Sequence, residues 1–506
     1  MKKVTFYILS LLTAFGGTSC DQGFDELNVN PIAPTTLNPL YLMNNAIIRA
    51  SFPGQTLVYE EAIVQQMVTP NGGVLAGGNF NQDNKFVNAG LWQRYYREVF
   101  KSTVDVLDKT RTDANRANLY QMARIWRAYA AMVLTDTYGD VPYSEAGLGF
   151  LQANITPKYD AQQTIYADIL KELDEASVAL DEAKTRETGD VLYSGDVARW
   201  RRLGYSLLLR AAMRHSKVDP ATAQSYAARA VAGGLMQSNA DNGVVRHTTL
   251  YTNELGTTLN GSEANNYYLT NNFVRYLRAN RDPRLASIAV RYVGAKSGAE
   301  QVTARLSRDT TIQIGMPLGY DNGTIVPVAA GSGLASFYDY SQLDRTRLGK
   351  IDAPAFLITH AQTQLLLAEA VVRGWAPGSA ASSYATGIRS HMEQMGSYDA
   401  NSRVDTGAVS AYVRVNPLVA ARALEQINTQ YWVASFLNGP EAFANFRRSG
   451  FPALAPNPYP GRAISGTFIR RLSYPDSELS LNLGNVQQAL SRQGPDNLDT
   501  RVWWDK

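Results

Sequence analysis

Cysteine and histidine are scarce in this chain of 506 residues, which has one cysteine and four histidines. A single cysteine excludes a disulfide within the chain, and no histidine stands at metal-ligand spacing from another histidine or from Cys20. The motifs H-E-x-x-H, G-x-S-x-G, G-x-x-x-x-G-K-[ST] and G-x-G-x-x-G do not occur. We therefore expect no thiol nucleophile, no metal site and no cofactor.

The chain also lacks a strong excess of either charge. Its 48 basic and 45 acidic side chains give a net charge of +3. Nucleic-acid binding usually needs a clear basic excess or patch, so we expect no nucleic-acid partner. With 45% hydrophobic and 18% charged residues, the composition is that of a folded protein.

Long hydrophobic runs are missing as well, apart from Val4 to Phe15, which follows Lys2 and Lys3. A membrane-spanning helix needs roughly 20 apolar residues, whereas a secretory signal needs a shorter apolar core behind positive charge. We expect residues 1–19 to be a signal peptide and residues 20–40, which include the stretch NVNPIAPTTLNP, to be an extended tether.

Cys20 follows Gly17, Thr18 and Ser19 directly behind that signal. The cysteine can be a free thiol, half of an intermolecular disulfide or the attachment point of a lipid. Small residues before a cysteine at this position resemble a bacterial lipobox, which favours lipidation. Acyl chains on Cys20 would hold the mature chain to a membrane.

Helical periodicity dominates residues 41–506, which we expect to form a single, mainly α domain. Apolar residues recur at intervals of three and four in the stripes at 119–133 and 165–180. The order W-x-x-L-G-x-x-L, starting at Trp200, is close to the first helix of a tetratricopeptide repeat. The predicted helical hairpins are residues 198–215 with 220–234, 91–110 with 117–137, and 356–373 with 380–395.

Two segments, around 69–90 and 238–345, are rich in Gly, Asn, Thr and Tyr, and we expect an irregular, loop-rich half with few short strands. Adjacent acids such as Glu60 and Glu61 are expected on solvated faces. Sugars stack on aromatic rings and pair with amides and carboxylates, so the loops supply the candidate ligand contacts. These candidates are Asn79, Phe80, Asn81, Asp83 and Phe86; Asn265, Asn266, Tyr267 and Tyr268; and Phe337, Tyr338, Asp339 and Tyr340.

Several stretches together resemble the SusD/RagB-like outer-membrane nutrient-binding lipoproteins of the Bacteroidetes. The stretches are CDQGFDELNVNP from Cys20, DTYGDVPYSE from Asp136, ARWRRLGYSLLLRAAMR from Ala198, THAQTQLLLAEA from Thr359, NGPEAFANFRRSGFP from Asn438, RRLSYPDSE from Arg470 and the terminal VWWD.

This resemblance implies tetratricopeptide-like helical hairpins packed against an irregular ligand-binding half, and no enzymatic activity. It also implies a lipid on Cys20, display on the outer membrane facing the cell exterior, and a SusC-like TonB-dependent β-barrel as partner. The chain would capture an oligosaccharide or oligopeptide and deliver it to that barrel. Two alternatives remain at this point: a surface glycoside hydrolase with two loop carboxylates, and a scaffold that binds proteins only.

Overall fold

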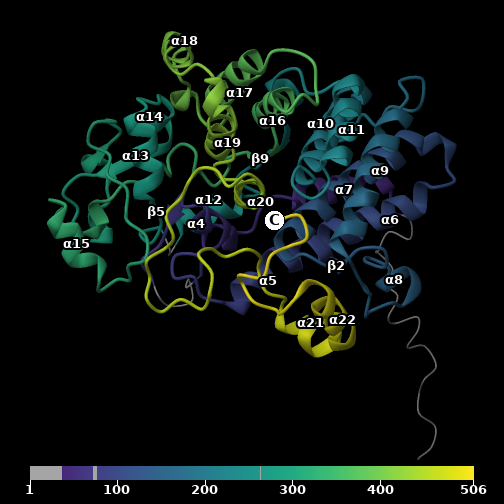
Figure 1. Ribbon diagram of the computed structural model, residues 1–506, viewed down its shortest axis with the longest axis horizontal. Helices are drawn as coiled ribbons and strands as arrows, with labels where there is room; N and C mark the ends of the chain where they lie inside the picture. Colours follow the sequence, from purple (N-terminus) through teal and green to yellow (C-terminus); the bar gives the residue numbers. More distant parts are fainter. Residues whose placement is uncertain (1–36, 72–76, 262–263) are drawn as a thin grey trace, which may run out of the picture. The chain divides into compact units, whose positions relative to one another are not determined.

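Helices that pack in pairs make up most of the structure, a computed structural model of the chain (Figure 1). It describes residues 37–71, 77–261 and 264–506. The predicted signal peptide, Cys20 and most of the predicted tether lie outside the described residues. Residues from Pro39 to Lys506 form one compact unit, and α3 begins at Pro39.

The helices and strands are short to medium in length. The α-helices are α3 (Pro39–Arg49), α4 (Glu60–Ile63), α5 (Lys85–Arg94), α6 (Lys101–Thr110), α7 (Ala117–Tyr138), α8 (Gly149–Gln152), α9 (Gln162–Ala179), α10 (Val197–Arg214), α11 (Pro220–Gly233), α12 (Glu254–Asn260), α13 (Asn271–Ala279), α14 (Arg284–Ile288), α15 (Ile325–Gly331), α16 (His360–Val372), α17 (Ala380–Gln394), α18 (Thr406–Val415), α19 (Ala423–Ala434), α20 (Gly439–Ser449), α21 (Asp476–Leu481) and α22 (Leu483–Gln493). The strands are β1 (Met67–Val68), β2 (Val141–Pro142), β3 (Tyr159–Asp160), β4 (Gly243–Val245), β5 (Tyr268–Leu269), β6 (Ala289–Tyr292), β7 (Leu306–Ser307), β8 (Gln342–Leu343) and β9 (Ala355–Ile358).

The predicted helical hairpins are all present. Helices α6 and α7, α10 and α11, and α16 and α17 pack against one another in the predicted pairs, and α9 lies against both α7 and α10. Figure 1 shows α9, α10 and α11 together, with α16, α17 and α19 beside them. The mainly α fold with few short strands is thereby confirmed.

Local sequence signals set the ends of the α10–α11 hairpin. The side chain of Asp196 accepts a hydrogen bond from the backbone N–H of Arg199 and caps α10, and Asp219 caps α11 through Thr222. Pro220 occupies the first turn of α11, where its missing N–H carries no penalty. The helix therefore begins at Pro220 behind the Asp219 cap and ends at Gly233, as KVDP and the pair Gly233–Gly234 predict.

Gly204 explains why the tetratricopeptide-like order has a glycine inside a helix. A Cβ at this position would lie 2.0 Å from Oγ of Ser177 on α9 and 3.1 Å from Ile125 on α7. Only a residue without a side chain lets α10 approach its two neighbours this closely. The glycine therefore serves packing between helices.

The segment 238–345 is more helical than expected, because it contains α12, α13, α14 and α15 among the strands β4 to β8. The Asn and Thr residues that suggested loops act as helix caps. Asn253 accepts hydrogen bonds from two backbone N–H groups of α12, and Thr270 accepts one from Phe273 of α13. Residues favoured in loops are also favoured at helix N-termini, so composition alone does not separate the two.

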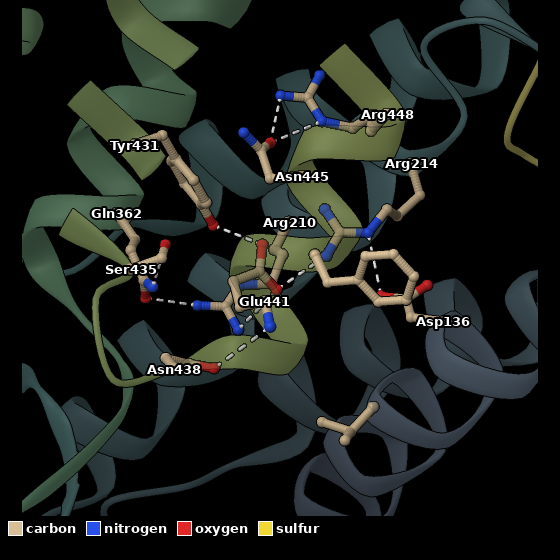
Figure 2. Close-up of polar contacts among 12 residues, drawn as sticks. Asp136, Arg210, Arg214, Gln362, Tyr431, Ser435, Asn438, Glu441, Asn445 and Arg448 are labelled. Carbon is tan, nitrogen blue, oxygen red and sulfur yellow. Dashed lines mark hydrogen bonds and ion pairs between the residues drawn. The ribbon is translucent and has the colours of Figure 1, made fainter. Parts of the chain in front are cut away.

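A buried ionic network joins helices that are far apart in the sequence (Figure 2). Arg214 on α10 is fully buried; its Nε lies 3.1 Å from Oδ2 of Asp136 on α7, and its Nη2 lies 2.8 Å from Oε2 of Glu441 on α20. Tyr431 on α19 donates to the other oxygen of Glu441, at 2.7 Å. The network fixes four helices against one another.

Apart from Tyr431, the residues of this network come from the stretches that carry the family resemblance. Trp504, from the terminal VWWD, donates its indole N–H to Oδ1 of Asp136 at 2.9 Å. Arg448 from the NGPEAFANFRRSGFP stretch binds both oxygens of Glu369 from the THAQTQLLLAEA stretch, at 2.8 and 2.7 Å. The stretches that carry the resemblance therefore supply contacts between packed helices.

Glu60 and Glu61 on α4 correct one expectation: they are not solvated but 1% and 0% exposed. Helix α4 packs against α20, and Oε1 of Glu60 and both oxygens of Glu61 have no hydrogen-bond partner among the described residues. Burial raises the pKa of Glu60 to about 8, and burial together with the charge of Glu60 raises that of Glu61 well above its usual range. Both side chains are therefore neutral at mildly acidic pH.

Replacing Arg214 by methionine should lower the free energy of unfolding by about 3–5 kcal/mol, because Asp136 and Glu441 lose a shared buried cation. Denaturant unfolding followed by circular dichroism measures the change. Arg229→Met is the matched control, since Arg229 is 57% exposed in its pair with Asp174, and it should leave stability unchanged within error. Equal stability of the two variants would contradict the central role of Arg214.

The raised pKa of Glu60 predicts that its contribution to stability is complete below its unfolded pKa of about 4.5 and is lost as pH rises toward 8. Glu60→Gln keeps the neutral form at every pH. The variant should match the original chain at pH 5 and melt about 2–4 °C higher at pH 9, as read by calorimetry. Glu425→Gln, at a half-exposed glutamate paired with Arg422, should show no such gain. A pH-independent difference would refute the assignment.

Candidate ligand-binding groove

The structure brings the three predicted loops together through short strands. Strand β1 pairs antiparallel with β5, so that Val68 lies opposite Tyr268. The backbone N–H of Leu269 donates to Ser341 O at 2.9 Å, which ties the second loop to the third. Residues around 68, 268 and 341, far apart in the sequence, therefore meet at one place.

A small separate core lies beneath this meeting point. It consists of the buried residues Val68, Tyr268, Met316, Leu318, Ile325, Ala329, Leu334 and Tyr340, with Ile314, Tyr320, Val328 and Phe337 packed against them. Burial of these apolar side chains holds the irregular segments in fixed positions. The loops thus have a rigid support of their own.

A groove of about 240 Å³ opens on this support. Amide, hydroxyl and ring groups mix in its lining with three prolines, and the lining contains no carboxylate. The lining residues are Gln65, Thr270, Asn271, Asn272, Pro317, Leu318, Tyr320, Ala455, Pro456 and Pro458. Such a mixture of flat apolar surface and a few polar groups suits a neutral, hydroxyl-rich ligand.

Gln65 is the most constrained residue of the groove. Its φ of +58° lies in the left-handed region, which costs a residue with a side chain about 1–3 kcal/mol. Its Nε2 donates to Ala455 O at 2.6 Å, while its carbonyl and Oε1 accept from Thr270 Oγ1 and Asn272 Nδ2. Strain held by this many bonds fixes the groove wall.

Two polar groups of the groove have no hydrogen-bond partner in the part of the chain that the structure describes. Thr270 caps α13, and this places Asn271 and Asn272 in the first helical turn, where both are half-exposed. The side-chain amide of Asn271 and the hydroxyl of half-exposed Tyr320 make no hydrogen bond among the described residues. These two groups can therefore bond a ligand without breaking an existing contact.

The first predicted loop lies beside the groove with most of its side chains turned inward. Asn79, Phe80 and Asn81 are 2%, 1% and 5% exposed. Asn79 donates to Thr69 O at 2.6 Å and accepts from the backbone N–H of Gly319 at 2.9 Å, and the Phe80 ring stacks on Tyr459 at 4.5 Å. These residues connect neighbouring loops to one another and are not part of the groove lining.

Asp83 and Phe86 are exposed, unlike their neighbours. Asp83 accepts hydrogen bonds from Asn88 and from Ser473 and lies 3.4 Å from Nζ of Lys85. Phe86 is 78% exposed at the start of α5, and it is the ring of this loop that solvent reaches most freely.

The second and third predicted loops are also largely internal. Tyr268 is fully buried, with its hydroxyl donating to Asn265 O at 2.6 Å, and Asp339 is buried against Arg291 at 2.8 Å. The Phe337 and Tyr338 rings stack on each other at 4.2 Å. Tyr267 and Tyr340 are buried, whereas Asn265, Asn266, Phe337 and Tyr338 are half-exposed.

Sequence reasoning found the loops but missed most of the groove lining. No sequence pattern predicts the left-handed backbone of Gln65. Asn271 and Asn272 lie a few residues after the predicted pair Asn265–Asn266, and nothing in the sequence distinguishes the two pairs. The run Pro456-Asn457-Pro458 offered one usable signal, because alternating prolines predict a stiff extended wall.

Among the described residues no three His, Cys, Asp or Glu side chains come together in a way that could hold a metal ion. Within the same residues, no helix has both the length and the apolar character needed to cross a membrane.

The profile of a SusD-like family, described as "Starch-binding associating with outer membrane", matches residues 31–475. This match covers most of the chain. The chain belongs to this family.

Several solved structures of similar proteins have the same fold. A chitin-binding protein is 31% identical, with a TM-score of 0.82, and the match covers 93% of this chain and 100% of that one. A Bacteroidetes SusD-like protein, AC2a, is 26% identical with a TM-score of 0.80 over 93% of this chain and 100% of its own. A chitin-binding SusD homolog from Flavobacterium johnsoniae is 26% identical with a TM-score of 0.74 over 92% and 98%. A search of curated proteins finds no match.

Proposed function

We propose that this protein binds an oligosaccharide in the groove of Asn271, Asn272 and Tyr320 and delivers it to a TonB-dependent barrel of the outer membrane. The observation that carries the binding step is the pair of unpaired groups, the Asn271 amide and the Tyr320 hydroxyl, on a rigid lining without charge. Amides and hydroxyls pair with sugar hydroxyls, and the Tyr320 ring and prolines offer flat faces for a sugar ring.

An oligosaccharide fits this groove better than an oligopeptide. A peptide presents charged termini and many backbone donors, and the groove offers no carboxylate or ammonium to meet them. Similarity to two chitin-binding proteins supports a glycan as well. We place chitin-type oligosaccharides first among the candidates, and starch-type oligosaccharides second on the family's description.

The competing glycosidase function finds no support at the groove. Glycoside hydrolysis needs two carboxyl groups facing the scissile bond. The loop carboxylate of Asp339 is buried against Arg291, and that of Asp83 is held by Asn88, Ser473 and Lys85. We therefore propose that the protein binds its ligand without cleaving it.

The groove variants test ligand binding directly. Tyr320→Ala and Asn271→Ala should each weaken the binding of chitohexaose about 10-fold in isothermal titration calorimetry, since each removes a ring face or a hydrogen bond worth about 1–2 kcal/mol. Tyr226→Ala, a half-buried tyrosine on α11 outside the groove, is the control and should leave affinity unchanged.

The result also decides between ligands. Tight binding of maltohexaose with no binding of chitohexaose would place the protein with starch binders. If neither chitohexaose nor maltohexaose binds, or if neither groove variant weakens binding, the groove assignment is refuted.

The membrane part of the proposal rests on Cys20, which we propose carries a lipid that anchors the chain to the outer membrane with the folded unit facing the cell exterior. Wild-type protein isolated from native membranes should remain in the membrane fraction and bring a TonB-dependent barrel with it. Cys20→Ala should appear in the soluble fraction, whereas Ser19→Ala should not, because only the cysteine accepts acyl chains. A Cys20→Ala protein that stays on the membrane would disprove the anchor.

A further inference from the structure

A second and larger cavity, of about 480 Å³, is lined by residues of α5, of the loop that carries α8, and of α21. Figure 1 shows where these three elements lie. We call this cavity the Trp92 cavity. It shares no lining residue with the groove. Its lining consists of Trp92, Gln93, Tyr96, Arg97, Lys101, Pro142, Ala146, Gly147, Gly149, Phe150, Ile155, Pro157, Ser477 and Glu478.

The floor of the Trp92 cavity is aromatic. Trp92 lies 4.7 Å from Tyr96, 5.1 Å from Tyr138 and 6.1 Å from Tyr159 between ring centroids. The Tyr96 hydroxyl donates to Pro142 O at 2.7 Å, so the ring is held in place. A rigid aromatic floor gains free energy when it receives an apolar group.

A π-helical turn sets the wall above this floor. Residues Tyr95–Phe100, between α5 and α6, are π-helical. Such turns are rare and occur often at functional sites. The turn itself carries Tyr96 of the floor and the exposed cation Arg97 of the rim, whereas Trp92 precedes it on α5 and the exposed Lys101 follows it as the first residue of α6.

Arg97 and Lys101 make no ion pair or hydrogen bond among the described residues, although the charge of Lys101 reaches Asp105 one turn further along α6. On the facing wall, Glu478 is half-buried, and within the described residues only one of its oxygens accepts a side-chain hydrogen bond, from Tyr159 at 2.8 Å. The cavity thus offers two free cations and one fixed acceptor around an apolar floor.

The rim adds exposed apolar surface that is held in place. Phe150 and Ile155 are 86% and 84% exposed. Their loop is fixed on one side by Glu145, which accepts from the backbone N–H of Lys158 at 3.0 Å, and on the other by Asn482, which donates to Pro157 O at 2.9 Å. Large apolar side chains held out in solvent beside a cavity are typical of an interaction site.

We propose that the Trp92 cavity binds an acidic peptide segment of a partner protein, with a bulky apolar side chain of that segment inserted over Trp92 and Tyr96. Acidic side chains of the segment would pair with Arg97 and Lys101. A backbone N–H would donate to the free oxygen of Glu478, and the rest of the segment would cover Phe150 and Ile155. Aromatic and arginine anchors around a pocket are the usual centre of such interfaces.

An acidic sugar fits the same cavity less well. A uronate would use Arg97 and Lys101, but it gains little from the aliphatic Ile155, which is exposed at the rim. Ile155 therefore favours a ligand with an apolar side chain.

The test uses a fluorescein-labelled hexapeptide of alternating Asp and Phe with the full chain, followed by fluorescence polarisation. Binding should be at least 10-fold tighter than for a Lys–Phe hexapeptide or an Asp–Ser hexapeptide. The double variant R97E/K101E should weaken it at least 10-fold, and so should Phe150→Ser with Ile155→Ser.

Matched controls lie elsewhere on the surface. Lys109→Glu makes the same charge change at an exposed position of α6 outside the cavity, and Leu250→Ser removes a side chain that is 98% exposed; neither should change binding. All the substituted residues are exposed, so unchanged melting temperatures will show that folding is intact.

Three results would overturn the proposal. One is absence of binding by the Asp–Phe peptide, and another is binding that the cavity variants do not weaken. The third is binding of tetragalacturonate that R97E/K101E abolishes and the Asp–Phe peptide does not compete, which would assign the cavity to acidic glycans.

Discussion

The position of Arg214 between Asp136 and Glu441 is the contact on which the arrangement of the helices depends. Two buried carboxylates and one buried guanidinium tolerate few geometries, because each charge must stay paired in a medium of low polarity. Helices α7, α10 and α20 supply one group each, so none of them can shift without exposing a charge to an apolar surrounding. The helical part is thus specified by polar contacts as well as by apolar packing.

This network changes how the stretches that carry the family resemblance are interpreted. The stretches that led to the family contribute Asp136, Arg214, Glu369, Glu441 and Trp504, and all five are buried. They hold the fold and do not contact the groove. The resemblance therefore identifies the scaffold, whereas the residues that line the proposed groove lie outside these stretches. Family membership and the identity of the ligand are separate questions for this reason.

The helical hairpins were predictable from the sequence because their signals are local. Asp219 caps a helix a few residues from Pro220, and Gly204 occurs at a fixed position in the tetratricopeptide-like order. Sequence reasoning named three loops as candidates for ligand contact, and it did not distinguish the residues that line the proposed groove from those that hold the loops together. Composition finds Asn and aromatic residues, yet it does not say whether Asn79 faces a ligand or holds Gly319 in place. That depends on long-range partners, as do the left-handed Gln65 and the burial of Glu60 and Glu61.

The two cavities differ in a way that bears on how such a protein can work. The groove is neutral and rests on the small core under the loops, whereas the Trp92 cavity is apolar with free cations and lies against the helical part. A neutral amide lining suits a sugar, and a cationic apolar site suits a protein segment. Because the sites share no lining residue, ligand and partner need not compete. A binding protein that must hold its cargo while it docks on another protein requires this separation.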